Sequence, residues 1–419
     1  MPKSDIVKSI DGIGYFIALI PTTIFFVTVA RHTPNIPYGD DYDAILVTLL
    51  RFQQATGWRE IILLITARHN EHCIALCRIA AILDYLVFGK VNFVRLALYG
   101  DFFLVGIAMV MIRAAGVWRQ AMAWPPVFLT LFGLRHYESE FWAMAALSNY
   151  AVIFFSFLAV YFLTQEKQTC FLAACLSATA GSFSQANGIL VFPIGLVSLI
   201  WWKRYPQALV WLAVFSMIAF AYFSIPSTDG AHMTPSTRLS ATLKFFFIFL
   251  GSVSDSPRHA LIIGAIAAVT VTVLAIWPKT GSNKPLALIS AFILITALAA
   301  AAGRTGFGTL TALASRYSIY STLILTTIYL SLAKTSNYTF LPAIFLACYF
   351  CIRSYNQELP KQIDRYEMLH RAHRQEGSGY VGLFYPPSEQ TAERILATAE
   401  ALMIYRLPPS HKNPEPAPK

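Results

Sequence analysis

A long apolar run leads directly into an acidic cluster near the start of the chain, where residues 12–43 read GIGYFIALIPTTIFFVTVARHTPNIPYGDDYD. Residues 12–30 are long and apolar enough to cross a bilayer as a helix, which Pro21 is expected to kink. Three carboxylates then fall within four residues, at Asp40, Asp41 and Asp43. Charge this dense beside lipid is costly without water, a partner or a task. The stretch therefore predicts a membrane protein with a functional acidic corner.

The composition of the whole chain indicates the same class. Of the 419 residues, 56% are hydrophobic and 13% are charged, whereas about a quarter of a soluble domain is charged. The sequence thus predicts an all-α polytopic membrane protein. Apolar runs of suitable length predict about eleven spans, at 12–30, 93–112, 118–134, 142–163, 170–184, 188–202, 207–225, 260–277, 286–302, 319–333 and 338–353.

Two polar regions interrupt this pattern. Residues 31–92 form a long first loop, in which Ala44–Thr66 and Ile74–Phe88 are amphipathic and predict helices lying along the membrane interface. Residues 354–419 form a polar C-terminal tail, with an amphipathic helix expected over 388–405 and Ser388 as its N-cap. The expected organisation is a transmembrane domain over 1–353 followed by this tail.

The distribution of basic residues predicts an orientation. With the N-terminus in the cytoplasm, the inside loops carry many of the cations, among them Arg113, Arg119, Lys203 and Arg204, and few acids, as the positive-inside rule requires. The net charge of +10 is then explained by basic residues in these loops, which lie near lipid phosphates. We expect no nucleic-acid partner. The first loop, the acidic cluster and the C-terminal tail all fall on the outer face.

The acidic cluster is the first candidate site. Asp40 or Asp41 could act as a general base toward an attacking hydroxyl, or the carboxylates could share a divalent cation such as Mg²⁺ or Mn²⁺. The alternative is a solvated loop that caps the next helix, with Asp43 as its N-cap. We expect function at Asp40 and Asp41.

Two further polar segments fall on the same predicted face. Residues 69–72 read HNEH and are expected to end the first amphipathic helix. They lack the His-Glu-x-x-His spacing of a zinc protease, so we expect no dedicated metal centre there. We interpret Asn70, Glu71 and His72 as substrate contacts. Residues 135–140 read RHYESE, and Glu138 could orient hydroxyl groups, although a plain solvated loop is equally compatible with this segment.

Arginines near two predicted membrane entrances form the cationic part of the site. Arg304 follows one span, and Arg316 and Tyr317 precede the next. Guanidinium groups bind phosphate oxygens bidentately, so these residues suit a phosphate held at the lipid surface. The alternative is an arginine that simply extends to the interface from a span end.

Together these features resemble the GT-C superfamily of integral-membrane glycosyltransferases. The resemblance rests on a first span followed by the Asp40-Asp41 pair in a long outer loop with interfacial helices, then many spans and a polar tail. Residues 69–72 and 314–317 also look like segments of uncharacterised bacterial members of that group. The resemblance covers most of the predicted spans, but the sequence motifs that support it are short.

The resemblance implies an enzyme of cell-envelope glycan biosynthesis in the cytoplasmic membrane. The donor would be a polyprenyl-phosphate-linked sugar, and the acceptor a hydroxyl of a glycan, lipid or protein. Asp40 would act as the base of an inverting transfer, and Arg316 with Arg304 would stabilise the leaving polyprenyl phosphate. Asp41, Glu71 and His72 would orient the acceptor or a cation.

Other classes of membrane protein are the competing interpretations. A lipid-linked-sugar flippase or secondary transporter should have repeated halves and ionisable groups near the bilayer midplane. The predicted spans are nearly uncharged, with Asp101 as the main exception. A membrane acyltransferase would need a histidine deep in a pocket, and the sequence around His232 and His259 provides no such context.

Overall fold

The computed structural model describes residues 3–225, 238–276, 283–333, 340–374 and 389–408, and the side chains within 12–225, 238–276, 283–333, 340–371 and 391–408. Within these ranges the chain is almost entirely helical, and its only strands are the two-residue β1 (Arg68–His69) and β2 (His72–Cys73). His232 and Ser388, which entered the sequence analysis, lie outside the described residues.

Six described helical segments are long and apolar enough to cross a membrane. They are Gly12–His32 in α1 (Lys3–His32), α5 (Phe93–Ala115), Ala143–Leu163, α12 (Tyr205–Ser224), α14 (Pro257–Ile276) and Lys284–Phe307, which includes α15 (Lys284–Arg304). The segment 143–163 is continuous through α8 (Ala143–Ala145), the π-helical turn η4 (Ala146–Tyr150) and α9 (Ala151–Leu163). The chain is therefore an all-α, multi-pass membrane protein.

Shorter helices complete the bundle. They are α6 (Trp124–Leu131), α10 (Gln168–Ser182), α11 (Val191–Trp201), α13 (Leu239–Leu250) and α16 (Ser318–Ala333). Four of them coincide with predicted spans, but each has 16 residues or fewer, whereas the six segments above have 20 or more. The sequence analysis did not predict α13, and the count of eleven spans stays a prediction.

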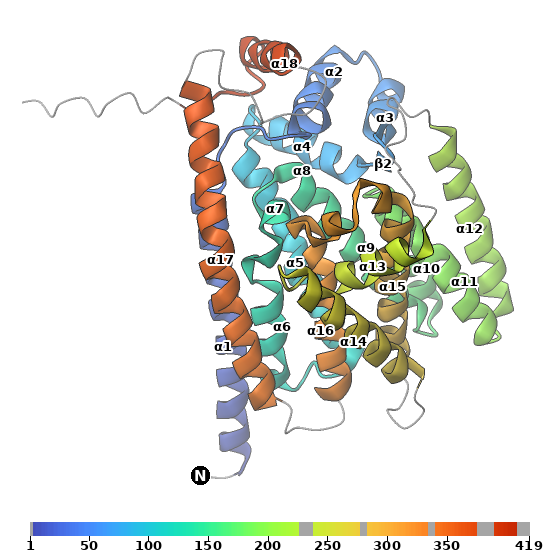
Figure 1. The fold of residues 1–419 in the computed structure, drawn as a ribbon. Helices are drawn as coiled ribbons and strands as arrows, with labels where there is room; N and C mark the ends of the chain where they lie inside the picture. Colours follow the sequence, from blue (N-terminus) through green and yellow to red (C-terminus); the bar gives the residue numbers. More distant parts are fainter. Residues whose placement is uncertain (1–2, 226–237, 277–282, 334–339, 375–388, 409–419) are drawn as a thin grey trace, which may run out of the picture.

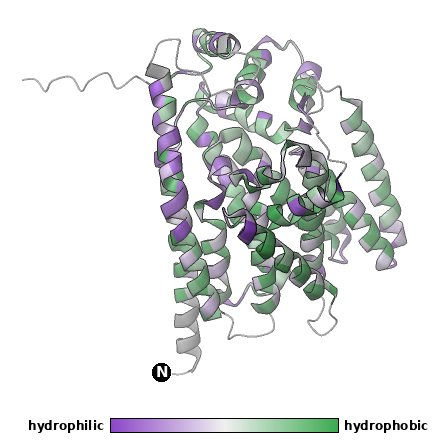
Figure 2. Cartoon of the chain, viewed as in Figure 1, coloured by the Kyte–Doolittle hydropathy of each residue, from purple (hydrophilic) through white to green (hydrophobic). Residues whose placement is uncertain are grey.

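The interior of the bundle is apolar and rich in aromatic side chains. Tyr150, Phe157, Trp211 and Phe292 are completely buried. A Cβ on Gly100 of α5 would lie 2.4 Å from the backbone carbon of Ala146, so glycine permits close contact between α5 and η4. Many large apolar side chains, such as Leu176, Leu209 and Phe220, are exposed on the outside of the bundle, as expected for a protein solvated by lipid, and the helices consist mostly of hydrophobic residues (Figure 2).

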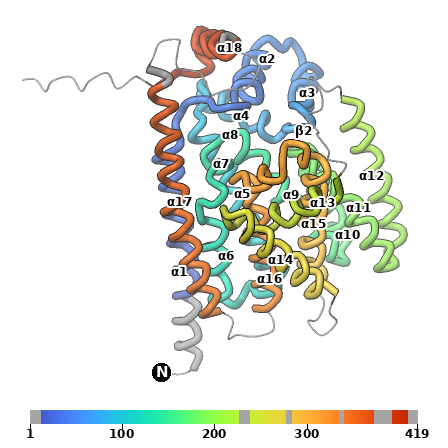
Figure 3. Tube along the Cα trace, viewed as in Figure 1, coloured from blue at the N-terminus to red at the C-terminus, as the bar shows by residue number. Residues whose placement is uncertain are grey.

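The first loop folds into short helices at one end of the bundle. These are η1 (Tyr42–Val47), α2 (Thr48–Gln54), α3 (Trp58–Thr66) and α4 (Ala75–Phe88), and Figure 3 follows the chain from α1 across to them. The prediction of α4 agrees with the structure to within one residue. The single helix expected over 44–66 was wrong, because extended backbone at Ala55 and Gly57 separates α2 from α3.

Two local expectations for this loop were also wrong. Asp43 lies inside the first turn of η1 and does not cap it, since the N-cap position belongs to Asp41. Residues 69–72 do not end a helix. They form the hairpin between β1 and β2, in which Asn70 adopts a left-handed φ of +53°, a conformation that asparagine tolerates better than most residues.

The C-terminal region returns to the end of the bundle that carries the first loop. α17 (Phe340–Arg374) is one helix, so the predicted boundary at residue 353 falls inside it. It runs alongside α1, and α18 (Glu389–Ala401) packs on η1, while the N-terminus is at the opposite end (Figure 1). Ile395, Leu396 and Tyr405 share an apolar cluster with Ile45 and Leu49.

Candidate functional site

The loop after α1 carries the acidic cluster and is attached to the bundle through Asp41. This side chain is 2% exposed. Its Oδ2 accepts a hydrogen bond from the Tyr38 backbone N–H at 3.1 Å, and its Oδ1 accepts one from Met144 at 3.0 Å. Asp40, the next residue toward the N-terminus, keeps 27% of its side-chain surface exposed. The two neighbouring carboxylates therefore have different environments, and Asp41 shapes the loop that presents Asp40.

Burial also changes the proton affinity of Asp41. Loss of solvent raises the pKa of its carboxyl to about 7, the nearby Asp40 charge adds to this effect, and the two backbone N–H groups oppose it. At neutral pH this group is therefore balanced between its charged and neutral forms.

A glycine sets the direction of the same loop. Gly39 has a φ of +53°, and a Cβ at this position would lie 3.0 Å from the ring of Trp142. Tyr38 packs edge-on against the same ring, with 5.3 Å between ring centroids. Any larger residue at position 39 would be strained in its backbone and would press on Trp142.

The hairpin brings His69 to Asp40. His69 is 7% exposed, and its Nε2 lies 3.6 Å from Asp40 Oδ2. This separation allows electrostatic contact but exceeds a hydrogen bond. The sequence analysis did not select His69, although it belongs to the HNEH segment. Asn70 supplies the left-handed turn residue that lets β1 and β2 pair.

An ion pair joins the hairpin to the end of α15. The Arg304 guanidinium bonds to the Glu71 carboxylate across 233 residues of sequence. His72 Nε2 lies 3.5 Å from Glu71 Oε1. Burial lowers the pKa of His72 to about 4 even though the Glu71 charge opposes this, so His72 is neutral at neutral pH. Glu71 thus holds a cation on one side and a neutral imidazole on the other.

Tyr222, near the end of α12, supports the hairpin from behind. Its hydroxyl donates to the Glu71 carbonyl oxygen at 2.9 Å and accepts from the Cys73 N–H at 3.2 Å. Arg68 Nη2 donates to the Tyr222 carbonyl oxygen at 2.9 Å. No sequence signal identifies Tyr222, since it is one aromatic residue within an apolar helix.

Arg316 and Tyr317 lie in η9 (Ser315–Tyr317), next to α7 (Tyr137–Glu140). The Arg316 backbone N–H donates to the Glu138 carboxylate at 3.2 Å. Burial lowers the pKa of the Arg316 guanidinium, but the Tyr317, Glu138 and Asp40 groups raise it, and the net pKa is above its ordinary value. Arg316 is therefore a permanent cation, and the charges of Glu138 and Asp40 favour its charged form.

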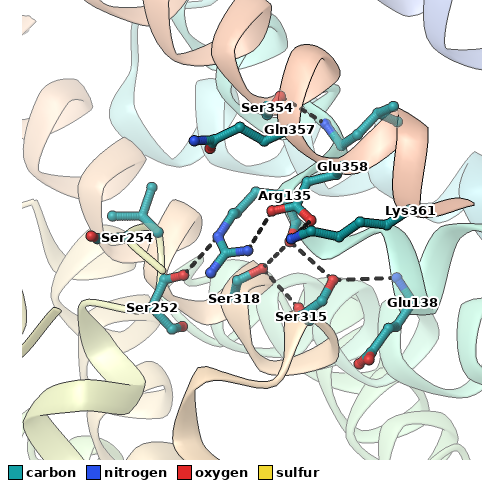
Figure 4. Close-up of polar contacts among 12 residues, drawn as sticks. Arg135, Glu138, Ser252, Ser254, Ser315, Ser318, Ser354, Gln357, Glu358 and Lys361 are labelled. Atoms are coloured by element: carbon teal, nitrogen blue, oxygen red, sulfur yellow. Dashed lines mark hydrogen bonds and ion pairs between the residues drawn. The ribbon is translucent and has the colours of Figure 1, made fainter. Parts of the chain in front are cut away.

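Serine hydroxyls fix η9 on the bundle. Ser315 Oγ and Ser318 Oγ donate to the Arg135 carbonyl oxygen at 3.0 and 2.9 Å (Figure 4). The Arg135 side chain is buried and pairs with Glu358 of α17 at 2.5 Å. A residue of the predicted C-terminal tail thus supports the segment that carries Arg316.

A second residue of the predicted tail also reaches the acidic loop. The Arg365 guanidinium lies over the rings of Tyr38 and Tyr137, at 5.1 and 5.5 Å from their centroids. Its Nη2 is buried without a hydrogen-bond partner among the described residues. Arg365 lies twelve positions after the last predicted span, within a polar segment, and for this reason the sequence analysis did not select it.

A cluster of ionisable side chains is also buried inside the bundle. His136 Nδ1 is 2.7 Å from Glu140 Oε1 and 2.7 Å from the Tyr150 hydroxyl. Asp101 of α5 is also completely buried. Asp101 has no hydrogen-bond partner at either carboxylate oxygen among the described residues.

The structure thus gathers most of the predicted site residues in one region, which we call the acidic rim. Asp40, Glu71, His72 and Arg304 form one group, and Glu138, Arg316 and Tyr317 form a second that Asp40 links electrostatically to the first. Asp41 lies behind them. Over the described residues, no three or more His, Cys, Asp or Glu side chains are arranged to hold a metal ion.

Comparison of the chain with models of known protein families, with curated proteins and with solved structures finds no match.

Proposed function

We propose that the chain is a membrane glycosyltransferase of the GT-C kind, which moves a sugar from a polyprenyl-phosphate donor to a hydroxyl of a glycan, lipid or protein. The observation that carries this proposal is a partly exposed carboxylate, Asp40, whose charge acts on Arg316, in a group of residues that also contains Arg304. The Asp40 side chain is 27% exposed, its charge raises the pKa of Arg316, and Glu71 holds Arg304 through an ion pair. A base beside cations is the arrangement that such a transfer requires.

In the proposed reaction Asp40 takes the proton of the acceptor hydroxyl. The hydroxyl oxygen attacks the anomeric carbon from the face opposite the phosphate, and the bond from that carbon to the phosphate oxygen breaks. The polyprenyl phosphate leaves with the bonding electrons, and the configuration inverts. Arg316 and Arg304 stabilise the charge that develops on the phosphate.

The remaining rim residues position the reactants. His69, 3.6 Å from Asp40, orients the base. Glu71 and His72 contact acceptor hydroxyls, as does Glu138, which also fixes the Arg316 backbone. Asp41 keeps the loop in shape. A divalent cation is not required by this scheme, and the assay below includes one as a variable. The site would face the extracytoplasmic side of the cytoplasmic membrane.

The test is release of polyprenyl phosphate by the purified protein in lipid, given a panel of polyprenyl-phosphate sugars and hydroxyl acceptors, with and without Mg²⁺ or Mn²⁺. We expect Asp40→Asn to lower the turnover number about a hundredfold or more, as removal of a general base does. Donor binding should persist. Asp43→Asn is the matched control, because it removes a carboxylate three residues away and should leave turnover unchanged.

Full activity of Asp40→Asn would exclude Asp40 as the base. If labelled donor binds to the wild type but no donor and acceptor pair gives release, the transferase proposal fails and transport becomes the next hypothesis.

One observation favours that second candidate, a flippase or secondary transporter. Asp101, His136 and Glu140 are all buried inside the helical bundle, where ionisable groups often mark transport pathways. Reconstituted vesicles would then move a fluorescent lipid-linked sugar between leaflets without cleaving it, and Asp101→Asn would stop this movement while Asp40→Asn would not.

A further inference from the structure

A cavity of about 320 Å³ lies away from the acidic rim, between the turn at 253–255, the start of α14 and the middle of α17. Its volume is in the range of small-molecule sites. Tyr349 is 64% exposed and Arg353 is also exposed, so the cavity opens to the outer surface of the bundle. Of its lining residues, Arg135 also supports the candidate site, because its carbonyl oxygen holds η9, but no residue assigned a role in the proposed reaction lines the cavity.

The cavity lies at the level where the exposed surface of α17 changes from apolar to polar. Below it, Phe345 and Leu346 are 71% and 70% exposed, and Ile266 on the facing helix α14 is 62% exposed. Above it α17 is hydrophilic (Figure 2). A surface that is apolar up to one level and polar beyond it marks the boundary between acyl chains and head groups. The mouth of the cavity is therefore at head-group depth.

The cavity wall carries both signs of charge. Arg353 lies on the α17 side, where its Nε donates to Gln357 Oε1 at 3.3 Å, and Asp255 and His259 lie on the opposite side. Arg135 also reaches the wall, but its charge is already paired with Glu358 at 2.5 Å (Figure 4). The exposed permanent charges on the wall are thus one cation and one carboxylate, Arg353 and Asp255.

The inner wall is apolar and aromatic. Ile263 of α14 and Tyr349 and Phe350 of α17 line it. An occupant with a charged end at the mouth and hydrocarbon along these side chains would satisfy both parts of the cavity, whereas a free inorganic ion would leave the apolar wall uncovered.

We propose that this cavity binds a zwitterionic aminophospholipid from the surrounding bilayer. Arg353 and His259 contact the phosphate, Asp255 accepts hydrogen bonds from the ammonium group, and the acyl chains pass Ile263 and Tyr349. One cation and one carboxylate match a head group that carries one charge of each sign, while an anionic phospholipid would meet Asp255 unfavourably. This site is independent of the proposed transfer reaction.

The test is native mass spectrometry of the full chain, purified in detergent, stripped of lipid and then titrated with phosphatidylethanolamine, phosphatidylglycerol or inorganic phosphate. The wild type should retain one phosphatidylethanolamine in preference to phosphatidylglycerol. Arg353→Gln should weaken that retention about fivefold, since an exposed charge pair contributes up to about 1 kcal/mol. Asp255→Asn should abolish the preference between the two lipids.

Arg119→Gln is the matched control, because it removes an exposed arginine that does not line the cavity and should change neither value. Arg353 and Asp255 are exposed, so both variants should fold, and melting temperatures check this. Equal retention of both lipids by the wild type would overturn the proposal, as would an unchanged preference in Asp255→Asn. Displacement of the lipid by inorganic phosphate alone would assign the site to free phosphate and also overturn it.

Discussion

Two adjacent aspartates have different environments because the chain turns between them. Asp40 faces the rim and His69, while Asp41 faces the bundle and accepts hydrogen bonds from Tyr38 and Met144. Adjacent residues of one type cannot be distinguished by composition or spacing. Only the turn, with Gly39 in its left-handed conformation, assigns one to the candidate reaction and the other to the loop.

The buried carboxyl predicts a pH-dependent stability. In the unfolded chain Asp41 ionises near its ordinary pKa of 3.8, and in the folded protein near 7. The folded state binds the extra proton between these values, so stability from this group is greatest below about pH 4 and declines until about pH 7. The full effect is on the order of 4 kcal/mol. Melting temperatures in detergent across this range measure it.

His72 acts in the opposite sense, because its pKa is lowered to about 4. The unfolded state then binds more protons between about pH 4 and 6.5, and this contribution to stability rises with pH. The informative quantity is therefore the difference between the wild type and Asp41→Asn. We expect the variant to lose the decline assigned to Asp41. Parallel pH profiles for the two proteins would show that Asp41 does not titrate in this range.

At the scale of elements, α17 links the apolar bundle to the candidate site. Its lower part faces lipid, and its upper part places Glu358 beside Arg135 and Arg365 beside Tyr38. A hydropathy pattern divides this helix at residue 353, where the apolar residues end. The helix continues because its polar residues gain buried partners, which residue-by-residue hydropathy does not include.

The Arg135–Glu358 pair gives a prediction about α17. Both side chains are buried, so Glu358→Ala leaves a guanidinium without its partner and should lower the free energy of unfolding by about 3–5 kcal/mol. Denaturation in detergent measures this loss. The double variant Arg135→Met/Glu358→Leu should recover most of it, because no unpaired charge remains.

Lys361→Ala is the control, since the Lys361 side chain contacts the same carboxylate at 2.7 Å but is 50% exposed. We expect only a small change there. If Glu358→Ala were no less stable than Lys361→Ala, the pair would not support the fold.

At the scale of the whole molecule, the first loop and α18 share one end and the N-terminus lies at the other (Figure 1). The arrangement predicts that Thr56→Cys and Met403→Cys react with a membrane-impermeant thiol reagent from the same side, and Gln120→Cys only from the opposite side. All three positions are exposed. The experiment uses intact bacterial cells and a background in which Cys170, Cys175 and Cys348 are replaced by alanine.

The positive-inside rule further predicts that Thr56→Cys and Met403→Cys are labelled from outside the cell. Labelling of Gln120→Cys from outside would reverse the orientation and place the candidate site in the cytoplasm. Labelling of Thr56→Cys and Met403→Cys from different sides would contradict the shared end itself.

The amino-acid sequence alone determined the class of the protein and the kind of residue at its candidate site. Apolar runs specify membrane helices because hydrophobic burial depends on local composition. Acids or arginines at the ends of such runs can be identified from the sequence without knowledge of the fold. The tertiary structure alone decided which of them meet. Glu71 and Arg304 are 233 residues apart, and Tyr222 and Arg365 carry no local signal. Their placement depends on how the helices pack, which is a property of the whole chain.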